Sequence, residues 1–333
     1  MAAHHAIGVD IGGTKIYAGV INLETGQAIA TARKQTRPEK GAEFFLQRVG
    51  DVIEEAMANA KLTHHDDDRL AVGVGLAGQI DREHGVVLGA PNLATGLVNV
   101  DLARQLQDRL SLPVVLGNDV EVAAYGEQMF GSGRGCLDFI YISVGTGIGG
   151  AIIQNGSLCR GATGTAGEIG HTVVQYNGRF CSCGGRGHLE AYASRTAITR
   201  VIQAEMERGR PSKLSDLLKA EKSDSPEIRS KMLAKSVEDG DELVIEALNE
   251  GADYLGSGMG SVISFVNPQR IILGGGLIEA VPQFYERAVM RSRVSGLVIA
   301  GRQADVTRTT LGDDSGIVGA AWLAADKVAT DKN

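Results

Sequence analysis

The sequence repeats one pattern of strand, glycine-rich turn and strand in two distant places. Residues 7–21 read IGVDIGGTKIYAGVI, and residues 139–153 read FIYISVGTGIGGAII. When the two stretches are aligned, Gly13-Thr14 falls on Gly145-Thr146. An internal duplication of this kind predicts two similar lobes, each offering a phosphate-binding hairpin to one nucleotide. The alternative is a chance similarity between two glycine-rich hairpins.

Each turn has the composition of an anion-binding site. Glycines leave backbone N–H groups open to a phosphate, while a threonine adds a hydroxyl and a lysine a positive charge. Asp10 lies on an otherwise apolar strand beside the first turn, which suggests Mg²⁺ held through water. A plain hairpin is the alternative for either turn. The turn residues are Gly12, Gly13, Thr14 and Lys15 in the first stretch, and Gly145, Thr146, Gly147 and Gly149 in the second.

Four candidate metal ligands lie within one glycine-rich stretch. Cys181 and Cys183 are separated by one residue, and His171 and His188 flank them. Two thiols and two imidazoles form a Cys₂His₂ ligand set, which predicts Zn²⁺ in a closed structural site without a water ligand. The glycines that follow Cys183 let the chain turn tightly around the metal. A chance cluster in a loop is the alternative.

Two further strands end at residues that can reach a ligand. The segment VVLGND ends at Asn118-Asp119 before a helix. A helix N-cap without a ligand role is one interpretation of Asp119. The carboxyl end of a strand in a parallel sheet is also where ligands bind. The segment RIILGGGLI runs into Gly274, Gly275 and Gly276, whose backbone can approach an adenosine ring or ribose. A plain strand-to-helix turn is the alternative there.

Composition narrows the classes of function. The chain has 333 residues, 43% of them hydrophobic, which is enough for a substantial core in two domains. Its net charge of −7 and its lack of a basic run argue against a nucleic-acid-binding surface. No stretch approaches ~18 apolar residues, and the N-terminus lacks the pattern of a signal peptide. Four cysteines fit a reducing compartment, so we expect a cytoplasmic protein.

Hydrophobic periodicity predicts the helices around these strands. Residues 208–240 are polar and read as an irregularly helical insertion without a catalytic role. The HHDDD sequence at residues 64–68 fits a solvated loop better than a metal site. The predicted helices cover residues 42–60, 99–110, 191–207 and 241–266.

The sequence GEIGH followed by C-x-C-G-x-x-G-x-x-E resembles the signature of the ROK family (repressor, open reading frame, kinase), which includes bacterial glucokinases. The resemblance extends over nearly the whole chain. It implies an α/β fold of the actin-like ATPase (ribonuclease H-like) class, with two lobes around a nucleotide and sugar cleft. The expected lobes are residues 1–118 plus about 312–333, and residues 119–311 with the zinc loop. His188 replaces a cysteine of the family pattern, and Ala77 replaces a proline.

The resemblance also implies roles for individual residues. Asp119 is the expected catalytic base. His171 is expected to bind zinc through one ring nitrogen and the sugar through the other. For Asn92, a turn without a ligand role is the alternative. The expected sugar-binding residues are Gly78, Asn92, Asn118, Asp119, Glu168, His171 and Glu190. The expected ATP-binding residues are Asp10, the two Gly-Thr turns, and Gly274, Gly275 and Gly276.

The reaction implied is the phosphorylation of a hexose by ATP with Mg²⁺, with glucose converted to glucose 6-phosphate. N-acetylglucosamine, N-acetylmannosamine and fructose kinases use nearly the same motifs, and polyphosphate is an alternative donor. A sugar-responsive repressor would need a helix-turn-helix ahead of the kinase core. The expected first strand begins at residue 6 or 7, which leaves no room for one in this sequence, so we do not expect a repressor. We also expect a homodimer.

Overall fold

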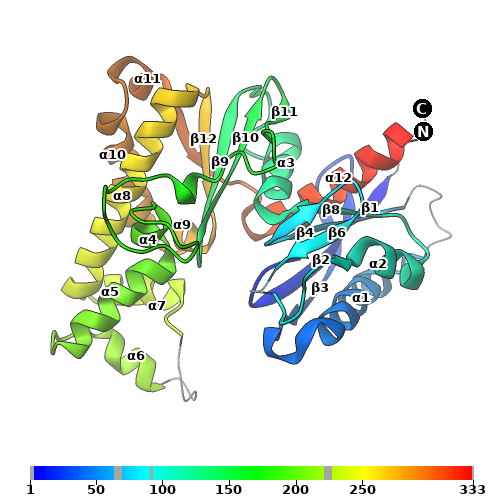
Figure 1. Ribbon diagram of the computed structural model, residues 1–333, viewed down its shortest axis with the longest axis horizontal. Helices are drawn as coiled ribbons and strands as arrows, with labels where there is room; N and C mark the ends of the chain where they lie inside the picture. The colour runs from blue at the N-terminus through cyan, green and yellow to red at the C-terminus, as the bar shows by residue number, and fades with distance from the viewer. Residues whose placement is uncertain (1–3, 64–69, 91–92, 221–226, 332–333) are drawn as a thin grey trace. The chain divides into compact units, whose positions relative to one another are not determined.

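The computed structural model describes residues 4–63, 70–90, 93–220 and 227–331. Within it the chain forms two compact units (Figure 1). The first, called the N-terminal unit, consists of Met1–Gly135 and Thr309–Asn333, and the second, called the C-terminal unit, consists of Cys136–Arg308. Each unit has its own sheet and its own buried core.

A five-stranded sheet forms the centre of the N-terminal unit. Its strand order is β3-β2-β1-β4-β8. β3, β2 and β1 pair with one another antiparallel, whereas β1, β4 and β8 run parallel. The carboxyl ends of the three parallel strands therefore meet at one edge of the sheet. The strands are β1 (His5–Ile11), β2 (Lys15–Asn22), β3 (Ala28–Gln35), β4 (Val72–Leu76) and β8 (Val114–Asn118).

Helices cover both faces of this sheet. Helix α1 (Gly41–Ala60) matches the helix predicted over 42–60 and buries one face, which includes Phe45 and Val49. That face and α2 (Leu102–Leu110) share one core with alternate residues of β1. On the opposite face α12 (Ser315–Asp331) lies directly on the strands, because a Cβ atom on Gly8 would overlap a backbone carbonyl of this helix. Strands β5 (Gln79–Asp81), β6 (Val86–Gly89) and β7 (Val100–Asp101) form a small separate sheet.

The C-terminal unit repeats the same sheet. Its order is β11-β10-β9-β12-β13, with antiparallel pairs around β9 and β10 and parallel pairs around β12. Strand by strand this matches the first sheet, so the duplication predicted from the two hairpins is confirmed. The strands are β9 (Phe139–Val144), β10 (Ile148–Gln154), β11 (Ser157–Leu158), β12 (Arg270–Gly274) and β13 (Asp305–Arg308).

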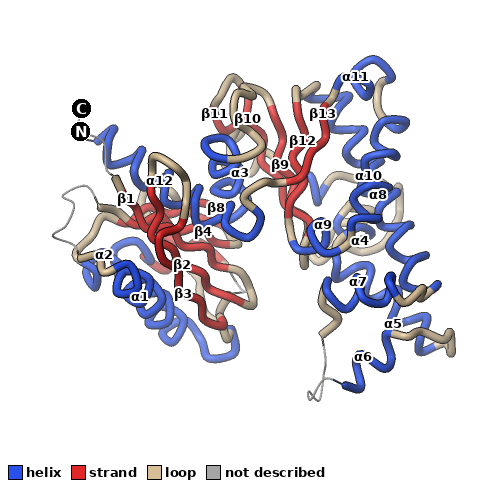
Figure 2. Tube along the Cα trace, turned by 180° about the vertical axis from the view of Figure 1, so that it is seen from behind, coloured by secondary structure: helices blue, strands red, loops and turns tan. Residues whose placement is uncertain are grey.

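Two helices pack closely in the C-terminal unit, α8 (Glu242–Val266) and α10 (Pro282–Ser295) (Figure 2). The glycines of α8 permit this approach, since a Cβ atom on Gly256 would lie 2.5 Å from the carbonyl oxygen of Ala288. The other helices are α4 (Glu190–Ala193), α5 (Arg195–Glu207), α6 (Leu214–Ala220), α7 (Ser230–Glu238), α9 (Gly276–Ala280) and α11 (Val298–Gln303). Short 3₁₀ turns occur at Pro38–Lys40, Ile169–His171 and Gly312–Asp314.

Some boundaries differ from the sequence-based expectation. The N-terminal unit extends past residue 118 to Gly135, because α3 (Asp119–Phe130) packs against α12. The helix expected over 191–207 is divided into α4 and α5 at Ser194, whose side chain accepts a hydrogen bond from the backbone N–H of Ala197. The predicted HHDDD loop at 64–68 lies outside the described residues. None of the described helices has the length and apolar character needed to cross a lipid bilayer.

Candidate active site

Two carboxylates lie at the carboxyl edge of the N-terminal sheet. Asp10 on β1 is in register with Gly75 on β4, and Gly75 is in register with Gly117 on β8. Asp119 follows β8 directly and begins α3. Gly75 on the intervening strand carries no side chain, and a Cβ atom there would lie 3.6 Å from the Asp119 Cα atom. Both aspartates predicted to take part in catalysis and Mg²⁺ binding are thus brought to one place.

Asp10 lies half-buried against the start of α12. A Cβ atom on Gly316, the second residue of that helix, would lie 2.8 Å from the Asp10 carboxyl carbon, so a glycine is needed there. Burial raises the pKa of Asp10 to about 7, and the negative charges of Asp119 and Asp313 add to this effect, while Lys15 opposes it. A carboxylate whose ionisation is disfavoured in this way is a place where a bound cation is favourable.

The β1–β2 turn carries the first predicted phosphate site. The backbone N–H of Gly12 donates to the carbonyl of Lys15 at 2.9 Å, which closes the turn, and the Thr36 hydroxyl donates to the Gly12 carbonyl at 2.7 Å. Gly13 and Thr14 are exposed. The Lys15 ammonium is paired with Asp313 at 2.9 Å, so a phosphate would compete with that carboxylate for the lysine.

Asn118, not Asp119, caps α3. Its Oδ1 accepts hydrogen bonds from the N–H groups of Val120 at 3.0 Å and Glu121 at 3.3 Å. The capping alternative for Asp119 is therefore wrong, because the carboxylate belongs to the first residue of the helix rather than to the residue before it. Since the cap uses the Asn118 oxygen, its amide NH₂ group is the part suited to donate to a sugar hydroxyl.

Of the other predicted sugar-binding residues in this unit, one can be placed. Gly78 is exposed just after β4, near the same edge as Asp10. Asn92 lies outside the described residues.

The second predicted phosphate turn, between β9 and β10, and the three glycines at 274–276 lie at the same edge of the C-terminal sheet. Gly145 donates its N–H to the carbonyl of Gly147 at 2.9 Å, which closes the β9–β10 turn. Strand β12 is parallel to β9, with Gly274 in register with Ser143, so both strands end together. Gly275 has a φ of +93°, and a Cβ atom there would crowd the backbone of Val144. Only glycine fits that position.

The four predicted metal ligands converge. One donor atom from each of His171, Cys181, Cys183 and His188 lies within 4.8 Å of all the others. The Cys181 sulfur is 3.7 Å from His171 Nδ1, and the Cys183 sulfur is 3.2 Å from His188 Nδ1. Tetrahedral zinc places a sulfur and a nitrogen ligand roughly 3.6 Å apart, and these two separations lie close to that value, so the donor set and its spacing suit a Cys₂His₂ site.

His171 faces two ways. Its Nδ1 atom points to the cysteine cluster, while its Nε2 atom lies 4.0 Å from a carboxylate oxygen of Glu168. The short 3₁₀ turn Ile169–His171 lies on β10, because a Cβ atom on Gly170 would overlap the carbonyl of Ile148. The GEIGH segment is thereby fixed beside the phosphate turn of its own unit.

Glu190 connects the cysteine cluster with that turn. Its Oε2 accepts the backbone N–H of Ile148 at 2.9 Å, and its Oε1 lies 3.3 Å from the Ser182 hydroxyl and 3.9 Å from the Cys181 sulfur. The sequence suggested only a sugar-binding carboxylate at this position. The structure adds a role in holding the two segments together.

Two residues at the start of α5 also hold the β9–β10 turn, and no sequence motif indicates them. Arg195 Nη2 donates to the Thr146 hydroxyl at 2.9 Å, and the Thr196 hydroxyl donates to the Thr146 carbonyl at 2.8 Å. No motif joins these residues to the turn, which lies far from them along the chain. The one available signal was Ser194, a residue type that favours the start of a helix.

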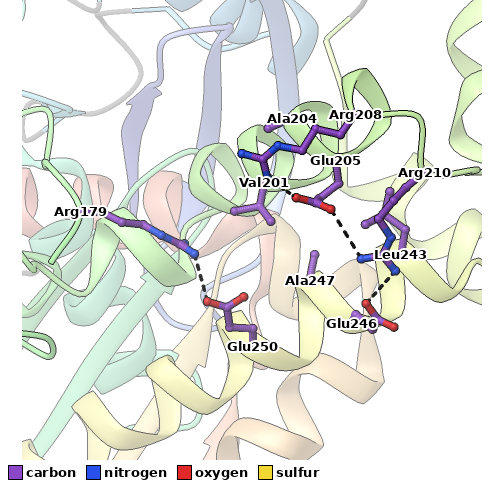
Figure 3. A pocket seen from close by; sticks show the side chains of 10 residues that line it. All are labelled: Arg179, Val201, Ala204, Glu205, Arg208, Arg210, Leu243, Glu246, Ala247 and Glu250. Carbon is purple, nitrogen blue, oxygen red and sulfur yellow. Dashed lines mark hydrogen bonds and ion pairs between the residues drawn. The ribbon is translucent and has the colours of Figure 1, made fainter.

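A cavity of about 380 Å³ lies elsewhere in the C-terminal unit, between α5 and α8 (Figure 3). None of the predicted ligand-binding residues lines it. Its arginines are paired with its glutamates, as with Arg179 and Glu250 at 3.0 Å and Arg210 and Glu246 at 2.8 Å. Because these charges are already neutralised, the cavity lacks the polar groups free to converge on a substrate that an active site needs.

Comparison with known proteins agrees with these features. A family model described as the ROK family matches residues 6–327. The glucokinase of Thermotoga maritima is 32% identical over 325 residues, covering 97% of this chain and 98% of that protein. The crystal structure of a ROK family glucokinase from Streptomyces griseus, in complex with glucose and AMPPNP, matches with a TM-score of 0.82 and 34% identity, covering 97% of this chain and 99% of that one.

A regulator matches as well. The xylose repressor of Bacillus subtilis is 28% identical over 330 residues, covering 97% of this chain and 78% of that protein. The glucokinases match over nearly their full length, and the described residues of this chain present the duplicated hairpins and two neighbouring aspartates at one sheet edge. The chain belongs to the ROK family, as an ATP-dependent sugar kinase with the actin-like ATPase fold.

Proposed function

We propose that this sugar kinase transfers the γ-phosphoryl group of ATP to a hexose hydroxyl, with glucose as the preferred acceptor and glucose 6-phosphate as the product. The single observation that carries the proposal is the position of Asp119 at the carboxyl edge of the sheet, next to Asp10 and near the β1–β2 turn. The glucokinase relatives, one of them solved with glucose and AMPPNP, support the choice of acceptor and donor.

Asp119 is the proposed general base. Its carboxylate accepts the proton of the hydroxyl on C6 while that oxygen forms a bond to the γ-phosphorus, and the bond from phosphorus to the ADP oxygen breaks. Such a transfer needs positioned reactants and neutralised phosphate charge more than covalent help from the protein. The N–H groups of the two Gly-Thr turns, and the Thr14 and Thr146 hydroxyls, are the donors that we assign to the phosphates.

Mg²⁺ fits the surroundings of Asp10. Partial loss of hydration raises the pKa of that carboxyl group, the negative charges of Asp119 and Asp313 add to the effect, and Lys15 opposes it. We propose that Asp10 holds hydrated Mg²⁺ through water. When bound, the ion supplies charge neutralisation for the nucleotide phosphates.

Zn²⁺ fits the cluster of His171, Cys181, Cys183 and His188. There it would brace the segment that carries Glu168 and Glu190, called the sugar loop, and take no part in the chemistry. With Nδ1 directed to the metal, the Nε2 atom of His171 and the carboxylate of Glu168 are free to bond neighbouring sugar hydroxyls. We assign sugar binding to these two residues, together with Gly78, Asn118, Glu190 and Asn92. We also propose a homodimer.

Two alternatives remain within the same chemistry. The acceptor could be N-acetylglucosamine, N-acetylmannosamine or fructose, and the donor could be polyphosphate. The match to xylose repressors favours one further candidate, a sugar-responsive regulator.

One experiment separates these functions. Initial rates would be measured with glucose, N-acetylglucosamine, N-acetylmannosamine, mannose and fructose, first with ATP and then with polyphosphate. The proposal predicts the highest kcat/KM for glucose with ATP. A higher value for another pair would transfer the assignment to that pair. Absence of turnover with every pair, combined with sugar binding detected by calorimetry, would favour the regulator.

A further inference from the structure

Arg195 occupies a place beside the second phosphate turn that none of the family motifs accounts for. Its side chain is only 17% exposed. One of its terminal nitrogens donates to the Thr146 hydroxyl at 2.9 Å and to a Glu227 carboxylate oxygen at 2.8 Å. Glu227 itself is 59% exposed, so the ion pair is open to water on the glutamate side.

The bond to Thr146 fixes the direction of that hydroxyl. A threonine hydroxyl has one proton and two lone pairs, and an arginine can only donate. When Arg195 donates to the Thr146 oxygen, it occupies a lone pair and leaves the hydroxyl proton to be given to another acceptor. A phosphate oxygen at the turn is an acceptor of this kind.

The guanidinium is not required to hold α5 against the turn. The backbone N–H of Arg195 donates to the Gly145 carbonyl at 2.9 Å, and the Thr196 hydroxyl donates to the Thr146 carbonyl at 2.8 Å. Ser194 caps the helix independently. Two contacts other than the arginine side chain therefore secure this junction, so the guanidinium is not needed for a purely structural role.

The charge of Arg195 also acts on the turn. A guanidinium stays charged at every working pH, and a cation held in place beside a phosphate costs no reorganisation during the reaction. The exposed Glu227 carboxylate balances it while the turn is empty. Water screens that exposed partner more than it screens the enclosed arginine.

We propose that Arg195 is a positioning residue for the phosphoryl donor, which orients the Thr146 hydroxyl toward the outer phosphates and adds a fixed positive charge beside them. The proposal rests on the function assigned above, because it takes the β9–β10 turn as a phosphate site. It assigns no direct contact with the sugar.

Four variants test it: Arg195→Ala, Arg195→Lys, Glu227→Gln and Thr146→Val. Calorimetric titration with AMPPNP and Mg²⁺ gives nucleotide affinity independently of turnover, and steady-state rates give kcat and both KM values. The loss of a charge-assisted bond predicts a roughly tenfold or larger rise in Kd for AMPPNP and in KM for ATP in Arg195→Ala. The KM for glucose and the melting temperature should stay close to those of the wild type.

The remaining variants separate positioning from a plain ion pair. Arg195→Lys should recover part of the affinity, because it keeps the charge but not the planar fork. Glu227→Gln breaks the same ion pair but keeps the arginine, so its Kd should change less than about threefold. In a Thr146→Val background, Arg195→Ala should cost less than it does alone, since the two residues act through one hydroxyl.

Different results overturn different statements. Equal loss of affinity in Arg195→Ala and Glu227→Gln would show that only the ion pair matters, and unchanged AMPPNP binding in Arg195→Ala would remove the residue from donor binding. Nucleotide binding that depends on Arg195, without phosphorylation of any sugar, would refute the proposed function and leave this inference standing. A wild-type protein that binds no AMPPNP would refute both.

Discussion

Glu190 and Ile148 join the cysteine cluster to the phosphate turn: the glutamate Oε2 accepts the isoleucine N–H at 2.9 Å. The other carboxylate oxygen faces Ser182 and Cys181 in the cluster. One side chain therefore links the loop that we assign to the sugar with the turn that we assign to the nucleotide.

This link predicts that Glu190→Ala raises the KM for both substrates, because the turn loses the acceptor of its N–H group while the sugar loop loses its attachment. Glu190→Gln keeps an oxygen that can accept from Ile148, so it should affect the sugar KM more than the ATP KM. Steady-state kinetics with each substrate varied in turn measures both. An effect of Glu190→Ala on the sugar KM alone would reduce Glu190 to a sugar ligand.

Asp10 should make stability depend on pH in a defined direction. Its folded-state pKa is raised from 3.8 to about 7, so the folded protein binds the proton more tightly than the unfolded chain does. Its contribution to the free energy of unfolding is therefore greatest at low pH, and it falls as pH rises from about 4 to about 7. At 1.36 kcal/mol per pKa unit, the fall amounts to at most about 4 kcal/mol.

The matched variant for this effect is Asp10→Asn, which is always neutral. Urea unfolding without Mg²⁺ between pH 5 and pH 8 should show the variant gaining stability relative to the wild type as pH rises. Adding Mg²⁺ with AMPPNP should shrink that difference, because the bound cation favours the ionised form. Parallel pH profiles for the two proteins would contradict the burial of an ionisable group at this position.

Metal removal should act mainly on sugar binding. Elemental analysis should find one zinc per chain, and His188→Ala should lose it, whereas His188→Cys should keep it because a thiolate is an equally suitable ligand. The stripped protein, assayed after Mg²⁺ is restored, should have lost sugar affinity and activity, with a much smaller change in AMPPNP affinity. Full activity in a sample shown to contain no zinc would refute a bracing role for the metal.

Much of this arrangement could be predicted from the sequence, because its determinants are local. A Gly-Thr turn between two apolar strands specifies a hairpin by itself, and its recurrence at Gly145-Thr146 predicted the second sheet. Likewise, the spacing of His171, Cys181, Cys183 and His188 was enough to predict the cluster. Periodicity predicted the helix over residues 42–60, since the spacing of its apolar residues is a local property of the sequence.

The remaining features depend on tertiary contacts between residues far apart in the chain. No pattern in the sequence reveals that Arg195 reaches Thr146 or that the Glu190 carboxylate accepts from Ile148. The alternative that Asp119 caps α3 was wrong by one residue, because Asn118 and Asp119 are both good N-caps and only the backbone geometry decides between them. The extent of the N-terminal unit similarly follows from the packing of α3 on α12.

The most direct test of the central claim is the turnover of Asp119→Asn with glucose and ATP. The amide keeps the size of the side chain but cannot accept the hydroxyl proton, and general-base assistance contributes ~10²–10⁴-fold. We predict that kcat falls by at least about a hundredfold while calorimetry shows nearly unchanged glucose affinity. A kcat close to that of the wild type in this variant would contradict the assignment of Asp119 as the catalytic base.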